Sequence, residues 1–240
     1  MSVSVVLPTY NESHNIIQLL KEILSVIPKN AECLVVDDDS QDGTGKLVKT
    51  TFAKNRRVRI FIRKKEKGLG TAVLFGLNRT RRSLVIIMDS DFNHQPRYLP
   101  LFLKHVVKYD LVCGSRYVKG GDMPETPLRF WGSYIFNLYI RCLLHSPVKD
   151  SLSGFVALRT SVLKQLTPQE KRAIFSGFGE WYIRLLWWAK DQGLKIKEVP
   201  VKYGSRLGDT SKMDFARSII DYTKTVIRLK QHGLKRLVVE

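Results

Sequence analysis

Two aspartates one residue apart, Asp89 and Asp91, follow an apolar run that ends at Met88. Residues two apart along an extended chain point to the same side, so both carboxylates can face one ligand. Hard carboxylate oxygens suit Mg²⁺ or Mn²⁺, and these ions also bind substrate phosphates. The alternative is a solvated turn whose aspartates cap the next helix, and the pair alone does not decide between the two.

Three adjacent aspartates, residues 37–39, end another apolar run in a chain whose net charge is +18. They could hold a ribose or a base edge through charge-assisted hydrogen bonds. The alternative is an N-cap cluster for the next helix, in which Asp42 or Thr44 would serve.

A glycine-rich segment, residues 68–70, precedes an expected helix and follows three lysines. Glycines at this position could let the backbone approach a phosphate. Val73 stands where a dinucleotide fingerprint would have its third glycine, which disfavours an oxidoreductase.

The elements that must position these residues alternate along the first half of the chain. Strands are expected at 3–7, 33–36, 58–62, 84–88 and 111–113, and helices at 11–27, 44–54, 70–79 and 98–107. Most of these strands are continuously apolar, which is typical of a mainly parallel, Rossmann-like α/β sheet with helices on both faces. Ligands bind beyond the carboxyl ends of such strands, so residues 10–12, 37–39 and 89–91 are expected on one rim.

The second half reads differently, beginning with a loop rich in glycine and proline after Tyr117. Helices are expected at 128–144 (rich in aromatic residues), 158–166 and 178–189, then a strand at 196–201 and a polar loop at 204–212. Residues 214–230 predict a basic amphipathic helix.

The amino-acid composition limits the classes of binding partner and the cellular compartment that are expected. A net charge of +18 implies an anionic partner: nucleic acid, an acidic membrane leaflet or phosphorylated substrates. The three cysteines are far apart, so a thiolate zinc site is not expected, and their odd number suggests reduced thiols in a cytoplasmic setting. Neither a signal peptide nor a run of ~20 apolar residues is apparent, so no transmembrane helix is expected.

Taken in order, these segments resemble the family 2 glycosyltransferases of the GT-A fold, over about residues 2–212. The first half matches at residues 7–12, 36–40, 42–44, 68–70 and 89–91. The second half is similar to the dolichol-phosphate mannose synthase branch, at residues 114–117, 150–155, 198–200 and 206–212. The resemblance implies a catalytic domain at 1–212, followed by the helix and tail at 213–240.

The resemblance also implies residue roles. The donor site would comprise Pro8, Tyr10, Glu12, Val36 and Asp38 around the nucleoside, with Asp89, Ser90, Asp91, Arg206 and Lys212 around the diphosphate. Asp89, Asp91 and Asn93 would hold the Mg²⁺ or Mn²⁺. The family often has Gln where Asn93 stands, and the shorter amide leaves direct or water-mediated metal contact open. The acceptor phosphate would meet Arg116, Arg129 and Ser133, and Asp91 and Arg116 would act in catalysis.

The chemistry agrees with these roles. A phosphate monoester has a second pKa of ~6, so a polyprenyl or dolichyl phosphate is already an anion and needs no strong base. In-line attack on the sugar predicts inversion at the anomeric carbon. The branch suggests GDP-mannose as donor, and UDP-glucose is the alternative.

A polyprenyl acceptor lies in a membrane, and the family often carries a membrane region after the catalytic domain. Here the 128–144 and 214–230 helices are expected to attach the chain peripherally to the cytoplasmic face of a membrane, alone or with a small membrane-spanning partner subunit. The alternative for 214–230 is a helix packed on the core.

Two other classes compete. A nucleic-acid-binding module would explain the charge, but the acidic motifs share one rim and no nucleic-acid motif is present, so nucleic acid is not expected as a partner. The other alternative is a catalytically dead scaffold, which the complete aspartate and arginine set disfavours.

Overall fold

The computed structural model describes residues 2–124, 127–204 and 215–234. One seven-stranded sheet organises the chain, with the strand order β3-β2-β1-β4-β6-β5-β7. The strands are β1 (Val3–Thr9), β2 (Glu32–Asp37), β3 (Val58–Ile62), β4 (Leu84–Ile87), β5 (Leu111–Ser115), β6 (Val156–Arg159) and β7 (Ile196–Pro200). All neighbouring strands pair in parallel except β6, which runs antiparallel to β4 and β5. The predicted α/β class with a mainly parallel sheet is confirmed.

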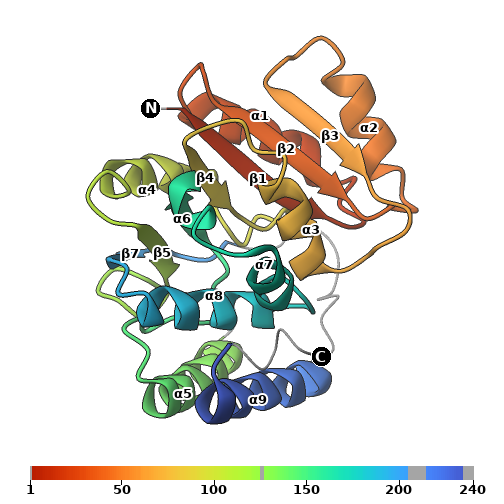
Figure 1. Ribbon diagram of the computed structural model, residues 1–240. Helices are drawn as coiled ribbons and strands as arrows, with labels where there is room; N and C mark the ends of the chain where they lie inside the picture. The colour runs from red at the N-terminus through yellow and green to blue at the C-terminus, as the bar shows by residue number, and fades with distance from the viewer. Residues whose placement is uncertain (1, 125–126, 205–214, 235–240) are drawn as a thin grey trace.

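Helices cover both faces of this sheet (Figure 1). They are α1 (Ile16–Val26), α2 (Thr44–Thr51), α3 (Leu69–Leu77), α4 (Leu99–His105), α5 (Pro127–Leu144), α6 (Thr160–Leu163), α7 (Pro168–Ile174), α8 (Glu180–Asp191) and α9 (Phe215–His232), with a 3-10 turn η1 (Pro96–Tyr98) before α4. Helices α1, α2 and α4 pack on one face, and α3, α7 and α8 pack on the other. Helices α5 and α9 lie side by side beyond α8, as an outer layer.

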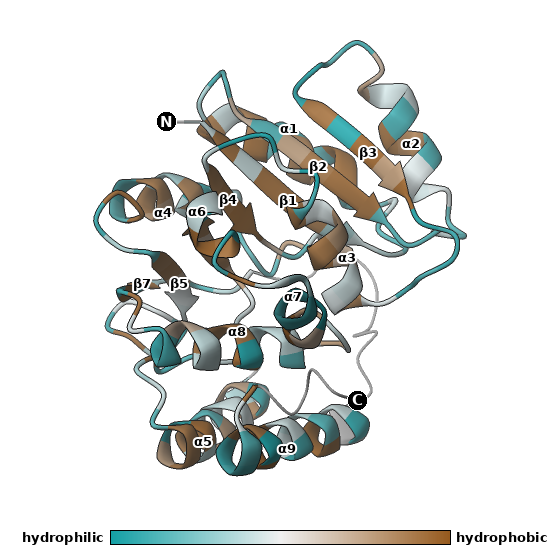
Figure 2. Cartoon of the chain, in the orientation of Figure 1, coloured by the Kyte–Doolittle hydropathy of each residue, from teal (hydrophilic) through white to brown (hydrophobic). Residues whose placement is uncertain are grey.

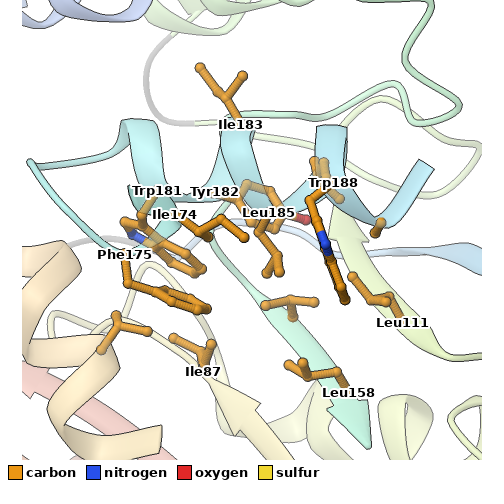
Figure 3. Packing of buried hydrophobic residues seen from close by; sticks show 14 of the residues in the cluster. Ile87, Leu111, Leu158, Ile174, Phe175, Trp181, Tyr182, Ile183, Leu185 and Trp188 are labelled. Carbon is orange, nitrogen blue, oxygen red and sulfur yellow. The ribbon is translucent and has the colours of Figure 1, made fainter. Parts of the chain in front are cut away.

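Strand side chains divide between two cores because successive residues of a strand point to opposite faces. In β1, Val6 belongs to the core under α8, whereas Val5 and Leu7 belong to the core under α1. The central strands are hydrophobic almost throughout, as expected for a sheet that is buried on both faces (Figure 2). Beneath α8, Tyr182 and Trp188 point toward strand residues such as Leu158 (Figure 3).

One sequence-based expectation was wrong. The segment 158–166 was predicted to be helical, but Leu158 lies in strand β6 and the helix begins only at Thr160. Leu158 ends the apolar run 155–158, and a run this short has no periodicity that separates a strand from a buried helix. Pairing with β4 and β5 on both sides decides the matter here.

The C-terminal helix α9 is both packed and exposed. Val226 and Leu229 are buried in the core under α8, whereas Ile220 and Ile227 are about half exposed (52% and 41%). Core packing, one of the two alternatives for this segment, therefore describes the side with Val226 and Leu229. The side with Ile220 and Ile227 remains available for the other alternative, contact with a membrane surface. Within the described ranges, none of the helices has the length and apolar character needed to cross a bilayer.

Candidate active site

A cleft of about 440 Å³ opens at the carboxyl ends of β1, β2 and β4. Segments 10–12 and 89–91, together with Asp38, meet at this rim, as the strand order predicts. The predicted site residues that line the cleft are Pro8, Tyr10, Glu12, Asp38, Asp89, Ser90, Asp91, Asn93, Arg116 and Arg129.

Two predicted site residues lie outside the cleft lining, and two others are not described by the structure. Val36 is fully buried in the core under α8, and its side chain does not line the cleft. Ser133 lies on α5 outside the cleft lining and contacts the Tyr117 hydroxyl. Arg206 and Lys212 fall outside the described residues, so their roles stay predictions.

Each rim loop turns over the strand end through one residue in the left-handed region. Asn11 after β1, Asp39 after β2 and Phe92 after β4 have φ values of 51°, 58° and 65°. This conformation costs roughly 1–2 kcal/mol for a residue with a side chain, less for Asn and Asp. Its repetition in three loops of one cleft marks them as a functional rim.

Hydrogen bonds join the β1 and β2 loops to each other. The Asn11 N–H donates to Ser40 Oγ at 2.8 Å, and Asn11 Oδ1 accepts from the Gln41 N–H at 3.0 Å. The Glu12 N–H donates to Thr44 Oγ1 at 2.9 Å. These bonds set the positions of Tyr10 and Glu12 at the cleft, and they explain why the two motifs occur together.

The aspartates of the β2 loop have different tasks. Asp37 is buried and accepts from Ser40. Asp42 accepts from the Ser13 and Thr44 backbone N–H groups at 2.9 and 3.0 Å. Burial would raise the pKa of Asp42, but these bonds and the Thr44 hydroxyl outweigh it and lower the pKa to about 2. Asp37 and Asp42 therefore organise the loop, but the N-cap of α2 is Gly43, so neither Asp42 nor Thr44 is the N-cap residue that the alternative supposed.

Asp38 lines the cleft while it anchors the glycine-rich segment. Its carboxylate accepts from Arg63 Nε at 2.7 Å and from the Gly68 N–H at 2.8 Å. The Gly70 N–H donates to the Gly177 carbonyl at 3.0 Å. These two backbone donors are satisfied inside the protein, while Gly68 and Leu69 still line the cleft, so the phosphate-cradle interpretation of residues 68–70 stays a prediction. A Cβ on Gly70 would lie 2.8 Å from the Ser176 carbonyl oxygen, and Gly68 has a φ of 130°, so both positions favour glycine.

Asp89 and Asp91 fit a divalent cation that is shared with a substrate. Both line the cleft, and the Asp89 side chain is 41% exposed. Across the described ranges no group of three or more His, Cys, Asp or Glu residues is arranged to hold a metal ion. Mg²⁺ commonly binds one or two carboxylates plus substrate phosphates and water, so the pair suffices. Asn93 Nδ2 donates to Asp91 Oδ2 at 2.9 Å, which orients that carboxylate.

A histidine that sequence reasoning missed supports this loop. His94 Nδ1 accepts from the Asp89 N–H at 2.9 Å, so Nε2 carries the proton, 3.0 Å from both the Ser153 carbonyl and the Tyr203 hydroxyl. Burial is the main cause that lowers the pKa of His94 to about 4, and the ring is neutral at pH 7. Its place three residues after Asp91 was the only signal in the sequence.

Arg116 is held by a buried carboxylate. Its Nε and Nη2 each lie 2.8 Å from Asp150, which is fully buried. Burial opposes the charged form, but Asp150 outweighs it and raises the pKa of Arg116. The guanidinium still lines the cleft, and its Cζ lies 4.7 Å from the Tyr203 ring centroid.

The far wall of the cleft comes from α5 and α9. Arg129 of α5 and Tyr222 of α9 both line it. Tyr222 packs so closely that a Cβ on Gly179 would lie 1.9 Å from its hydroxyl. Burial, with Glu180 and Asp89 nearby, raises the pKa of Tyr222, and Arg129 opposes the shift. The last described helix therefore completes the site, which the sequence did not indicate.

The sheet and its acidic rim define the class of GT-A glycosyltransferases. Residues 4–167 match glycosyl transferase family 2, and the chain belongs to this family.

Several characterised proteins are similar along most of the chain. A dolichol-phosphate mannosyltransferase of Pyrococcus furiosus is 34% identical over 238 residues, covering 95% of this chain and 64% of that protein. An undecaprenyl-phosphate mannosyltransferase of Micrococcus luteus is 32% identical and covers 98% of each. A polyprenol monophosphomannose synthase of Mycolicibacterium smegmatis is 35% identical, over 87% of this chain and 80% of that protein.

A solved structure agrees in fold. Glucosyl-3-phosphoglycerate synthase from Mycobacterium tuberculosis, crystallised with Mn²⁺, UDP-glucose and phosphoglyceric acid, has a TM-score of 0.72. The match covers 95% of this chain and 79% of that one at 21% identity, which supports the fold alone.

Proposed function

We propose that this chain transfers mannose from a nucleotide-sugar, GDP-mannose in the first instance, to a polyprenyl or dolichyl phosphate. The observation that carries the proposal is the arrangement of the cleft, in which Asp89 and Asp91 share one cavity with Arg129 on α5. The names of the three relatives support both the sugar and the lipid phosphate.

On the donor side, Pro8, Tyr10, Glu12 and Asp38 would contact the nucleoside. A divalent cation held by Asp89 and Asp91 would stabilise the charge that develops on the leaving diphosphate. His94 keeps the Asp89 backbone in place, so the carboxylate needs little rearrangement when the donor binds. The roles of Arg206 and Lys212 are carried forward from the family resemblance, whereas the buried side chain of Val36 would support the nucleoside pocket only from behind.

On the acceptor side, Arg129 would bind the lipid phosphate, because a guanidinium can donate two parallel hydrogen bonds to it. Arg116, already oriented by Asp150, would add positive charge from the cleft wall. Ser133 lies one helical turn beyond Arg129 and would need a rotamer change to reach the phosphate.

In the reaction, a phosphate oxygen of the acceptor attacks the anomeric carbon as the bond to the donor diphosphate breaks. The attacking oxygen is already ionised at neutral pH, because the second pKa of a phosphate monoester is ~6. The residues of the cleft therefore need to align the acceptor phosphate with the donor diphosphate and to neutralise the repulsion between these two anions. Asp91 would at most assist the attack of the phosphate oxygen. Single in-line displacement inverts the anomeric configuration.

The outer layer suits a membrane surface. The exposed side of α5 carries Leu128, Trp131, Ile135 and Leu138, which are 90%, 58%, 65% and 37% exposed. We call these four residues the α5 stripe. On α9 the basic side chains of Arg217, Lys224 and Arg228 accompany exposed isoleucines. Apolar side chains with adjacent cations are typical of peripheral attachment to an anionic leaflet, and we assign the protein to the cytoplasmic face.

The test is a donor screen with purified chain, a short polyprenyl phosphate and Mn²⁺ or Mg²⁺. GDP-mannose is expected to give a lipid-linked mannose of inverted configuration. Transfer from UDP-glucose but not from GDP-mannose would replace the sugar while keeping the reaction. Absence of transfer or hydrolysis with every donor, at saturating metal and lipid, would contradict the enzyme and favour the scaffold alternative.

A further inference from the structure

A second cavity, of about 330 Å³, lies at the opposite end of the sheet from the cleft. Residues 80–82 line it just before β4 begins, and Thr160 lines it where antiparallel β6 has ended. Its volume is within the roughly 300–1,000 Å³ that small-molecule sites occupy. None of the proposed donor or acceptor residues contributes to it.

Four cations surround this cavity: Arg81, Arg82, Lys164 and Lys171. No carboxylate lines it, and in the described parts of the chain none of the four side chains forms an ion pair. The nearest acidic contact is through the backbone, because the Arg81 N–H donates to Glu32 at 3.2 Å. We call these four residues the basic quartet.

Of the buried arginines elsewhere in the molecule, two are neutralised by carboxylates, whereas Arg184 donates to the Ile174 and Ser176 carbonyls. Arg63 pairs with Asp38, and Arg116 pairs with Asp150. In the basic quartet, Arg82 Nε is buried without a hydrogen-bond partner among the described residues, as is Arg141 Nε on α5. A buried donor left unsatisfied costs ~1–3 kcal/mol, which a bound anion that draws in the guanidinium would relieve.

The cations do not serve to satisfy the end of α3, whose last residues also line the cavity. The carbonyls of Leu74, Gly76 and Leu77 already accept from the backbone N–H groups of residues 78–80. Leu77 and Phe175 provide an apolar floor. A cavity with an apolar floor and a ring of donors suits a compact ligand with a small organic part and a charged group.

From this geometry we infer that the basic quartet forms a binding site for a small phosphate-bearing anion, separate from the catalytic cleft. Phosphate is the anion that arginine and lysine bind most directly, by paired hydrogen bonds and by point charge. The cavity shares α3 and the segment after α7 with the cleft, since Phe178 and Gly179 line the cleft and Phe175 lines the cavity. A ligand here would contact the same two elements that border the donor.

The test measures binding of inorganic pyrophosphate by isothermal titration calorimetry, at low chloride and with EDTA so that no metal recruits pyrophosphate to the cleft. Lys164→Glu/Lys171→Glu is the test variant, because both side chains reach solvent, Lys164 just after α6 and Lys171 on α7. Lys46→Glu/Lys49→Glu on α2 is the matched control, with the same change in charge at two exposed lysines. Arg129→Ala controls for binding in the cleft.

Wild type and the α2 control are expected to bind pyrophosphate alike, and the test variant at least ~10-fold more weakly. Arg129→Ala removes any phosphate binding in the cleft and is expected to keep the binding that the test variant loses. Equal binding by the test variant would overturn the site, as would no binding by wild type at millimolar pyrophosphate. A parallel titration uses a 12-nucleotide single strand. If the strand binds more tightly than pyrophosphate and depends on the same two lysines, the ligand is a polynucleotide and the small-anion assignment is wrong.

Discussion

The donor side of the cleft takes its polar groups from segments that lie within a few residues of a strand end. Tyr10 and Glu12 follow β1, Asp38 follows β2, and Asp89 and Asp91 follow β4. The acceptor side draws on more distant parts of the chain. Arg116 and Tyr203 also follow strands, β5 and β7, but Arg129 and Tyr222 come from helices α5 and α9, and Asp150 comes from a loop. The donor side rests on local geometry, whereas the acceptor side rests on packing between elements.

The two sides also differ in what holds them. On the donor side, backbone donors join Asn11 and Glu12 to the β2 loop, beside a buried ion pair of Arg63 with Asp38. A buried ion pair, Arg116 with Asp150, dominates on the acceptor side. The comparison implies that donor-side substitutions will remove activity with little loss of stability, while some acceptor-side substitutions will remove stability itself.

The largest effect is expected for Asp89→Ala/Asp91→Ala. Loss of the cation that stabilises the leaving diphosphate should lower kcat by at least ~10⁴-fold, or ~5.5 kcal/mol. The exposed pair leaves the core untouched, so the melting temperature should change little. Asp191→Ala, at the exposed end of α8, is the control. Near wild-type transfer in the double variant, or in wild type with chelator, would refute the metal site.

Next comes Asp150→Asn, which leaves the buried Arg116 guanidinium uncompensated. The expected loss is ~3–5 kcal/mol in the free energy of unfolding, measured with urea. Adding Arg116→Met to the same chain should recover part of that loss, because the unpaired charge is then gone. A loss below ~1 kcal/mol for Asp150→Asn would mean that the acceptor side is not organised by this pair.

A smaller effect, on one substrate only, is expected for Arg129→Ala. Loss of a charged hydrogen bond to the acceptor phosphate, ~1.5–3 kcal/mol, should raise the KM for the lipid phosphate by about 10–100-fold. The KM for the nucleotide-sugar should stay nearly constant. Arg172→Ala, on the exposed side of α7, provides the control. Equal changes in both KM values would place Arg129 outside the acceptor side.

The smallest effect concerns attachment to membranes. Leu128→Glu/Ile135→Glu in the α5 stripe should reduce co-sedimentation with anionic vesicles about ten-fold at low salt, because two apolar side chains no longer enter the interface. Leu47→Glu/Val107→Glu changes two exposed apolar residues on α2 and after α4, and should bind as wild type does. Point substitutions are preferable to truncation before α9, since Tyr222 and Val226 belong to the folded structure.

Failure of wild type to bind anionic vesicles at low salt would exclude the α5 stripe as an anchor. A membrane-spanning partner subunit would then be required to bring the cleft to its lipid substrate.

The sequence pattern predicts the site correctly where the site residues directly follow strands along the chain. Apolar runs that end in aspartates are enough to predict strands, a parallel sheet and the rim on which Asp38, Asp89 and Asp91 meet, because parallel strands carry their carboxyl ends to one edge. The sequence pattern does not predict the structure where one pattern is compatible with two kinds of local structure. The apolar run that ends at Leu158 can form a strand or a buried helix, and its pairing with β4 and β5 decides for the strand.

The sequence by itself therefore determined the fold class, the donor rim and the residues available for phosphate chemistry. Only the tertiary structure decided that His94 is a neutral support for Asp89, that Asp150 holds Arg116, and that Tyr222 of α9 closes the cleft. The physical reason is the distance along the chain over which each interaction acts. Strand period and turn chemistry act over a few neighbouring residues, whereas a buried pair or a shared cavity depends on which distant surfaces the packed helices bring together.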